Sequence, residues 1–454
     1  MNCKAILTTA AAGAVLSVFS AVPAPEVSVS GMSQDSKGVA TISYTLSAAD
    51  AVVTLDIQTN ATVSGETVWA SIGGAAVSAA TGDVWKKVEQ GLRKITWDGA
   101  TNWADGKIPS SGIRAVVTAW SVDNTPDYMV VDISAAAKPN TQRYYPAVDF
   151  LPGGLLGNPD YRTTSLVMRK ILAKDVEWTM GSTALELQRS SNEKTHKVTL
   201  TNNYYIGVFE ITGGQWGLIQ TERVTPSYFN NNEYRAMRPV EQVCYNELRN
   251  AAGNSTEENP SHNWPNDPNP HSFLGLLCSK TGMKFDLPSE AQWEFAARGG
   301  NGDTKWGDGS GIRATIQDSS AEIEDSNLDN IGRYKKNAYK DGDLPPRDCE
   351  AEYGTAVVGS YAPNKYGLYD MSGNVFEFCL DWYEDEIDYE GMLNISPSDQ
   401  SKMLSGNTGG ARVIRGGCWY SVAAVCRPAW RGKTNANNRN SSYGFRVVCT
   451  AGLK

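Results

Sequence analysis

The chain has 454 residues, of which 41% are hydrophobic and 20% are charged. This composition excludes a disordered polyelectrolyte, a coiled coil and a collagen-like repeat, and the length predicts two or three globular domains. The formal net charge is -9 and the sequence has no long run of Lys and Arg, so nucleic acid is not expected as a partner. The 43 glycines exceed the usual share of about 7% and predict a fold rich in turns.

Residues 1–24 predict a secretory signal peptide. Lys4 precedes an apolar run from Ala5 to Val18, and small residues follow up to Ala24. The run is shorter than the roughly 20 residues that a membrane helix needs, although an uncleaved anchor is the alternative. Cys3 lies before the run, which argues against a lipoprotein anchor. We therefore expect a secreted, periplasmic or cell-surface protein with no transmembrane segment after signal cleavage.

Signal cleavage would leave seven cysteines, and this odd number implies at least one free or intermolecular thiol. They are Cys244, Cys278, Cys349, Cys379, Cys418, Cys426 and Cys449. In an oxidising compartment most such thiols pair, whereas in the cytosol they would indicate metal binding or catalysis. The cysteines form no CxxC motif, and the three histidines form no HExxH motif. A zinc or iron site built on histidines is therefore not expected.

Residues 25–138 predict an all-β sandwich. Short β-branched runs alternate there with Ser, Gly, Asp and Asn. The runs are VATISYTL from Val39, AVVTLDIQT from Ala51, IRAVVTAW from Ile113 and YMVVDIS from Tyr128. This pattern resembles the immunoglobulin-like modules that accompany bacterial surface proteins. Residues 139–170 are expected to form a connector, because their Pro and Gly residues discourage both helix and sheet.

Residues 171–454 predict a second domain of loops and short strands that contains one clearly bounded helix. Ser289 is the expected N-cap, Gln292 completes a capping box, and Gly299 supplies the left-handed stop. One buried face of this helix would carry Trp293, Ala296 and Ala297.

Seven collinear segments of this domain resemble the formylglycine-generating enzyme (sulfatase-modifying factor) family. They are WTMGS, the strand pair leading to FEIT, RPVEQVCYNELRNA, FDLPSEAQWEFAARGG, NKYGLYDMSGNVFEFCLDWY, RVIRGGCWYSVAAVCRPAWRG and NSSYGFRVV, over roughly Val176 to Val448. The resemblance implies an α+β fold with little regular secondary structure, related to C-type-lectin-like domains. Function is a separate question, because one fold hosts many activities.

The resemblance also implies a copper oxidase site, from which this sequence departs. Active relatives oxidise a sulfatase cysteine to formylglycine with O2 and a Cu(I) ion held by two cysteines, because soft thiolates suit that ion. Here the first copper position is Ser421, the oxygen-pocket serine is Cys418, and the pocket tryptophan is Phe376. Cys426 lies five residues after Ser421, but CRPAWR resembles a later family element with a structural cysteine. A copper pair of Cys418 and Cys426 is the alternative to their participation in disulfides.

The resemblance implies a better preserved cation site. Its calcium ligands would be Asp370, Gly373, Val375 and Glu377, and two carboxylates suit this ion. A second, weaker site would use Asn327 and Leu328. The acidic residues that follow are interpreted as a solvated face, as most such runs are. They are Asp381, Glu384, Asp385, Glu386, Asp388 and Glu390.

The resemblance further implies a disulfide between Cys278 and Cys449, with Cys379 and Cys426 as a second candidate pair; Cys244 and Cys349 stay unassigned. Three arginines are expected to connect loops, with a groove role for the first as the alternative: Arg427, Arg431 and Arg446. Core positions are expected for Trp306, Trp382, Trp419 and Trp430.

The leading hypothesis is an exported, calcium-stabilised binding or accessory domain that lacks the standard copper pair, with a peptide or glycan ligand at the RGG loop. The alternative is a formylglycine-generating oxidoreductase that uses copper and O2. A purely structural surface protein is the third hypothesis. The mutual positions and exposure of Cys418, Ser421 and Cys426 are the observation that best separates them.

Overall fold

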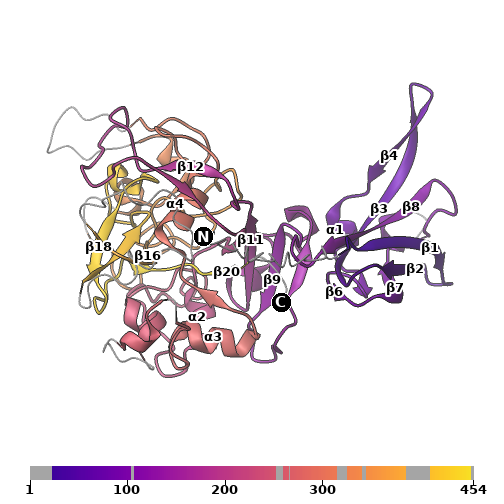
Figure 1. Cartoon of the computed structure of the whole chain (residues 1–454), viewed down its shortest axis with the longest axis horizontal. Coiled ribbons are helices and arrows are strands. Elements are labelled where there is room, and N and C mark those ends of the chain that lie inside the picture. The colour runs from indigo at the N-terminus through magenta and orange to yellow at the C-terminus, as the bar shows by residue number, and fades with distance from the viewer. Residues whose placement is uncertain are drawn as a thin grey trace, which may run out of the picture.

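Two lobes are visible in the computed structural model, with the N-terminal strands in indigo and most of the second lobe in magenta to yellow (Figure 1). The structure describes residues 23–103, 107–251, 259–264, 266–313, 325–339, 344–384 and 410–450. Most of the predicted signal peptide lies outside the described residues, as do Asp385, Glu386, Asp388 and Glu390 of the acidic run. Among the described residues, no helix has both the length and the apolar character that crossing a membrane requires.

The N-terminal lobe consists of two β-sheets, which confirms the predicted all-β region. One sheet has the order β1-β2-β7-β5, and in the other β3 pairs with β4, β6 and β8. The strands are β1 (Glu26–Gln34), β2 (Val39–Ser47), β3 (Ala51–Val63), β4 (Glu66–Ser71), β5 (Thr81–Gly82), β6 (Lys86–Val88), β7 (Gly91–Asp98) and β8 (Ile113–Ser121). In β2 every second side chain, from Ala40 to Leu46, is buried. This two-residue period arises because successive side chains of a strand point to opposite faces.

Tyr128–Asp132 forms the predicted strand, β9, but its placement in the N-terminal module was wrong. β9 pairs antiparallel with β10 (Arg143–Tyr145) and β11 (Ser165–Ile171), so residues expected to form a connector also supply strands. The six-stranded sheet has the order β10-β9-β11-β14-β20-β15, with β14 (Tyr204–Gly207), β20 (Val448–Thr450) and β15 (Phe285–Asp286). Alternation predicts a strand but not its partner. Here Met129 and Val131 are buried in the core of the C-terminal lobe.

The remainder of the C-terminal lobe is made of short elements joined by loops, as expected for this α+β fold. Its other strands are β12 (Glu177–Met180), β13 (His196–Thr199), β16 (Phe376–Trp382), β17 (Ala411–Arg415), β18 (Gly432–Asn435) and β19 (Tyr443–Gly444). The helices of the chain are α1 (Gly74–Val77), α2 (Gly213–Ile219), α3 (Phe273–Thr281), α4 (Glu290–Arg298), α5 (Leu328–Ile331) and α6 (Lys335–Ala338). The predicted caps of α4 are confirmed, because Ser289 and Gln292 form the capping box and Gly299 has a φ of 60°.

The two lobes share a hydrophobic core. Trp85 of the N-terminal lobe stacks on Tyr145 with 5.1 Å between ring centroids, and its carbonyl accepts a hydrogen bond from Tyr144 N at 2.8 Å. The same cluster continues through Val167 and Phe209 of the C-terminal lobe. The N-terminal lobe is therefore packed against the C-terminal lobe rather than joined to it by a chain segment alone.

Candidate functional site

The RGG loop follows β17 and brings together the residues of the altered copper site. Gly416 and Gly417 have φ angles of 90° and 74°, in the left-handed region that favours glycine. A Cβ on Gly417 would lie 2.6 Å from Sγ of Cys426, so this close approach requires glycine. Gly417 directly precedes Cys418, so the turn brings the chain close to Cys426 at this point.

Cys418, Ser421 and Cys426 are buried, with exposed fractions of 0%, 6% and 0%. Sγ of Cys418 lies 3.1 Å from Oγ of Ser421, and the backbone N–H of Cys418 donates to the same oxygen at 3.0 Å. Burial raises the pKa of Cys418 to about 12 and the pKa of Cys426 well above its ordinary value. Cu(I) needs deprotonated sulfur ligands. The Ser421 hydroxyl, at the position where the resemblance implies a thiolate, does not fit the copper ion that the resemblance implied.

Phe376 belongs to an aromatic cluster beneath the RGG loop. Its ring lies 5.5 Å from that of Trp430 and 6.2 Å from that of Tyr443. The expected core positions of Trp306, Trp382 and Trp419 are confirmed, whereas Trp430 is partly exposed. Tyr420 is the exposed aromatic residue of the loop, at 38%, and its hydroxyl lies 3.4 Å from Ser442 Oγ. Tyr420 is therefore the loop residue best placed to touch a ligand.

The structure forms neither of the two expected disulfides, because Cys278, Cys379 and Cys426 are free thiols. Cys278 and Cys449 are nevertheless neighbours: Cys449 is the register partner of Phe285, whose N–H lies 3.2 Å from Sγ of Cys278. Both thiols line a cleft of about 430 Å³ between α3 and β20. Cys426 lies against Gly417, the residue before Cys418, a proximity that sequence spacing alone did not decide.

The expected calcium ligands lie at a buried turn before β16. Oδ2 of Asp370 accepts a hydrogen bond from Gly359 N at 2.7 Å, while its Oδ1 is buried without a partner. Glu377, by contrast, accepts from Arg446 at 2.7 Å through each oxygen and from Trp293 Nε1 at 2.8 Å. In the part of the chain that the structure describes, no three His, Cys, Asp or Glu side chains are arranged to hold a metal ion. Calcium at this turn stays a prediction: Asp370 Oδ1 fits a ligand atom, and the neutralised Glu377 fits less well.

Glu210, which follows β14, contacts this turn and was missed by sequence reasoning. Its carboxylate accepts from Val375 N at 3.2 Å and from Asn374 Nδ2 at 2.6 Å, and the residue is fully buried. Burial, with the neighbouring Asp370 and Glu377, raises the pKa of Glu210 well above its ordinary value. Its only sequence signal is a lone acid inside the apolar segment VFEI.

The residues of the weaker cation site and the first residue of the acidic run are buried, except Asn327, which is partly exposed. Asn327 donates through Nδ2 to the Gly311 carbonyl at 2.7 Å, and Leu328 is buried in the core. Asp381, expected on a solvated face, is 2% exposed and accepts a hydrogen bond from Glu290 N at 2.7 Å. The solvated-face interpretation is therefore wrong for Asp381, because this carboxylate caps the start of α4.

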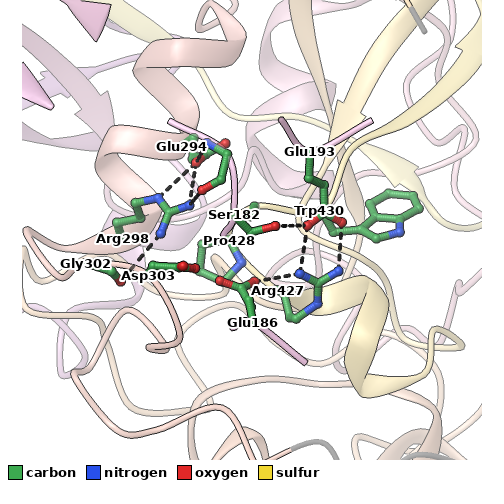
Figure 2. Close-up of polar contacts among 12 residues, drawn as sticks. Ser182, Glu186, Glu193, Glu294, Arg298, Gly302, Asp303, Arg427, Pro428 and Trp430 are labelled. Atoms are coloured by element: carbon green, nitrogen blue, oxygen red, sulfur yellow. Dashed lines mark hydrogen bonds and ion pairs between the residues drawn. The ribbon is translucent and has the colours of Figure 1, made fainter. Parts of the chain in front are cut away.

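Arg427 is fully buried, which excludes the groove role and confirms that it connects loops. It donates to Glu186 at 2.6 Å and to the two oxygens of Glu193 at 2.9 and 2.7 Å (Figure 2). Ser182 donates to Glu193 at 2.6 Å from the same loop after β12. Burial, together with a hydrogen bond to Asp303, raises the pKa of Glu186 to about 7. Arg431 and Arg446 form buried ion pairs of the same kind.

Glu241 is a buried carboxyl group whose titration should shape the pH dependence of stability. Oε1 accepts from Phe229 N at 2.9 Å, while Oε2 is buried without a partner. Burial raises the pKa of Glu241 to about 8. Because the folded-state pKa exceeds the unfolded one, the stability that this group contributes is complete at low pH and declines as the pH rises through about 8.

We expect the free energy of unfolding of Glu241→Gln to increase relative to that of the unmodified protein as the pH rises, because the amide cannot ionise. Between about pH 5 and about pH 8.5 this relative gain should be roughly 2 kcal/mol. Urea unfolding at the two pH values measures this difference. Glu66→Gln, on the exposed strand β4, is the matched control and should leave the difference near zero. An equal response of both variants would contradict the assignment.

The C-terminal lobe, whose fold is described above, matches a known protein family in sequence. The family model of the sulfatase-modifying factor enzyme 1-like domain matches residues 162–451. The chain belongs to this family. Its domain includes the end of the expected connector, which carries β11.

Among its relatives, the formylglycine-generating enzyme of Thermomonospora curvata is 32% identical over 192 residues, covering 40% of this chain and 56% of that protein. The serine/threonine-protein kinase pkn1 of Chlamydia pneumoniae is 37% identical over 162 residues, covering 36% of this chain and 20% of that protein. The chaperone protein LppX of Paenibacillus barcinonensis is 26% identical over 277 residues, covering 57% of this chain and 84% of that protein. The chain thus spans about a fifth of pkn1 and about half of the curated enzyme.

A solved structure, Treponema denticola variable protein 1, matches with a TM-score of 0.44 and 24% identity, covering 63% of this chain and 95% of that chain.

Proposed function

We propose that the protein is an exported binding or accessory protein of the sulfatase-modifying factor family that does not act as a copper oxidase. The observation that carries the proposal is the group of Cys418, Ser421 and Cys426, in which a hydroxyl lies 3.1 Å from one of two buried thiols. The signal-peptide pattern of residues 1–24 supports export. The ligand is a peptide or a glycan that contacts the RGG loop at Tyr420.

Two further features support an accessory role. A relative matched over 84% of its own length is named a chaperone, which is a binding activity. The N-terminal sheets share a core with the family domain, so they can hold it in a fixed orientation. The proposal keeps calcium at the Asp370 turn as a stabilising ion. Removing calcium with a chelator should then lower the thermal unfolding midpoint, and an unchanged midpoint would remove calcium from the proposal.

Copper binding and turnover test the proposal directly. The full mature chain is titrated with Cu(I) against a colorimetric chelator, and separately incubated with copper, O2 and a CxPxR peptide. We expect no stoichiometric Cu(I) binding and no aldehyde product, because a hydroxyl replaces one of the two thiolates that suit Cu(I). A formylglycine-generating enzyme with both copper cysteines serves as the positive control.

Variants identify the site if copper does bind. One equivalent of Cu(I) that is lost in Cys418→Ala or Cys426→Ala, and retained in the equally buried control Cys244→Ala, would overturn the proposal. Aldehyde formation would establish the alternative, a formylglycine-generating oxidoreductase with an altered ligand set. That alternative is favoured by one observation, the convergence of the three residues on one loop.

A further inference from the structure

The segment between β8 and β9 connects the N-terminal sheets to the C-terminal lobe and forms hydrogen bonds with strands of that lobe. Tyr205 of β14 lies 2.7 Å from Thr125 Oγ1 and donates to the carbonyl of Pro126. The backbone N–H of Lys170 donates to the carbonyl of Asp127 at 2.8 Å. Figure 1 shows β9 and β11 where the two lobes meet. Residues 124–127 therefore have a fixed position over β11.

Lys170 extends from β11 into this segment and is buried, with 3% of its side chain exposed. Its Nζ donates to Asn124 Oδ1 at 3.1 Å and to the carbonyl of Thr125. The ring of Trp120 lies 5.9 Å from the same nitrogen. A lysine side chain is seldom this completely withdrawn from water, and here the buried amine is held in contact with the amide of Asn124, an exposed residue.

A carboxylate completes this arrangement. Oδ1 of Asp127 lies 3.6 Å from Nζ of Lys170, and its Oδ2 lies 2.9 Å from the guanidinium of Arg169. A carboxylate oxygen in this position can act as a general base. Burial lowers the pKa of Lys170, which increases the share of neutral amine. An amine, an amide and a general base thus lie together on elements that do not move apart.

We propose that Lys170 and Asn124 become joined by an intramolecular isopeptide bond. Nζ of the neutral lysine attacks Cγ of Asn124, forming the Nζ–Cγ bond. Asp127 takes the proton that leaves Nζ and passes it to Nδ2, the Cγ–Nδ2 bond breaks, and ammonia departs. The step consumes no oxidant or other reagent. Asn124 is at the solvent-exposed end of the segment, so the ammonia can escape into water.

The bond would link the segment that follows β8 to β11, a strand inside the six-stranded sheet. It closes a loop of 46 residues between positions 124 and 170, which limits the freedom of the unfolded chain around the lobe junction. A protein on a cell surface or outside the cell gains resistance to separation of its lobes from such a link. This covalent site is independent of the RGG loop and of the copper question.

Peptide mass spectrometry of the purified full chain tests the proposal without any variant. Trypsin should release one branched peptide, in which residues 115–143 are linked to residues 170–174 with the mass of one ammonia missing. Cleavage after Lys170 should be lost, because its amine has become an amide. Recovery of unlinked residues 115–143 together with the free peptide 171–174 would overturn the proposal and leave Lys170 as a hydrogen-bonded lysine.

Three variants locate the chemistry. Asn124→Ala and Lys170→Arg should each abolish the branched peptide, and Asp127→Asn should reduce it at least about tenfold, since general acid–base catalysis contributes more than that. Lys174→Arg, an exposed lysine on the same segment, is the control and should keep the link. A branched peptide that persists in Asn124→Ala would contradict the assignment of the acceptor.

Discussion

Replacing Arg446 with methionine should destabilise the C-terminal lobe by about 3–5 kcal/mol, the usual cost of leaving one partner of a buried ion pair without the other. Arg446 is fully buried and contacts both oxygens of Glu377 at 2.7 Å. It also donates to the carbonyls of Gly207 and Tyr369, each at 3.0 Å. The nearby carboxyl of Glu210 loses a compensating positive charge as well.

Urea unfolding measures this loss of free energy. Arg93→Met is a matched control, because Arg93 pairs with Glu89 at 3.9 Å on the surface and donates to the carbonyls of Glu89 and Gln90 at 2.8 and 2.9 Å. Its loss should change stability by less than about 1 kcal/mol, since no charge is left buried. The double variant Glu377→Met with Arg446→Met should be more stable than Arg446→Met alone, since no uncompensated charge stays buried. Equal losses in the Arg446 and Arg93 variants would refute the role given to this pair.

Gly373→Ala should be almost as damaging, by about 3 kcal/mol or more, for two independent reasons. Gly373 has a φ of 97°, which L side chains adopt only with strain. A Cβ at this position would lie 2.1 Å from the carbonyl oxygen of Arg333, which is backbone and cannot rotate away. That same oxygen accepts the hydrogen bond from Asn374 N at 2.7 Å, so any shift also disturbs the turn before β16.

Soluble yield and the urea midpoint of Gly373→Ala are compared with those of Gly302→Ala. A Cβ at Gly302 meets nothing within 4 Å, and its φ is not in the left-handed region, so this control should stay close to the unmodified protein. A Gly373 variant that unfolds at the control's midpoint would show that the turn can relax.

Local signals in the sequence were sufficient for several elements. The start and end of α4 followed from Ser289, Gln292 and Gly299, because a capping box and a left-handed stop involve residues only a few positions apart. The alternation in β2 predicted its buried face for the same reason. Family membership followed from seven collinear segments, and the family match confirms it.

Local sequence signals did not predict contacts between residues that are far apart in the sequence. The pattern in β9 predicted a strand but could not show that its partners are β10 and β11. Cys418 and Cys426 were weighed as members of disulfides or as an altered copper pair, and in the structure both are buried free thiols. The Arg427 and Glu186 pair spans 241 residues of sequence, so no local spacing could predict it.

The sequence by itself determined the family, the two classes of lobe and the capped helix, since each of these is a property of residue identity or of short-range geometry. Only the tertiary structure decided which sheet β9 joins, which carboxylates neutralise the buried arginines, and that Lys170 meets Asn124 and Asp127. The physical reason is that burial and charge pairing depend on which surfaces meet when the chain closes, and residues far apart in sequence share no pattern that specifies that meeting.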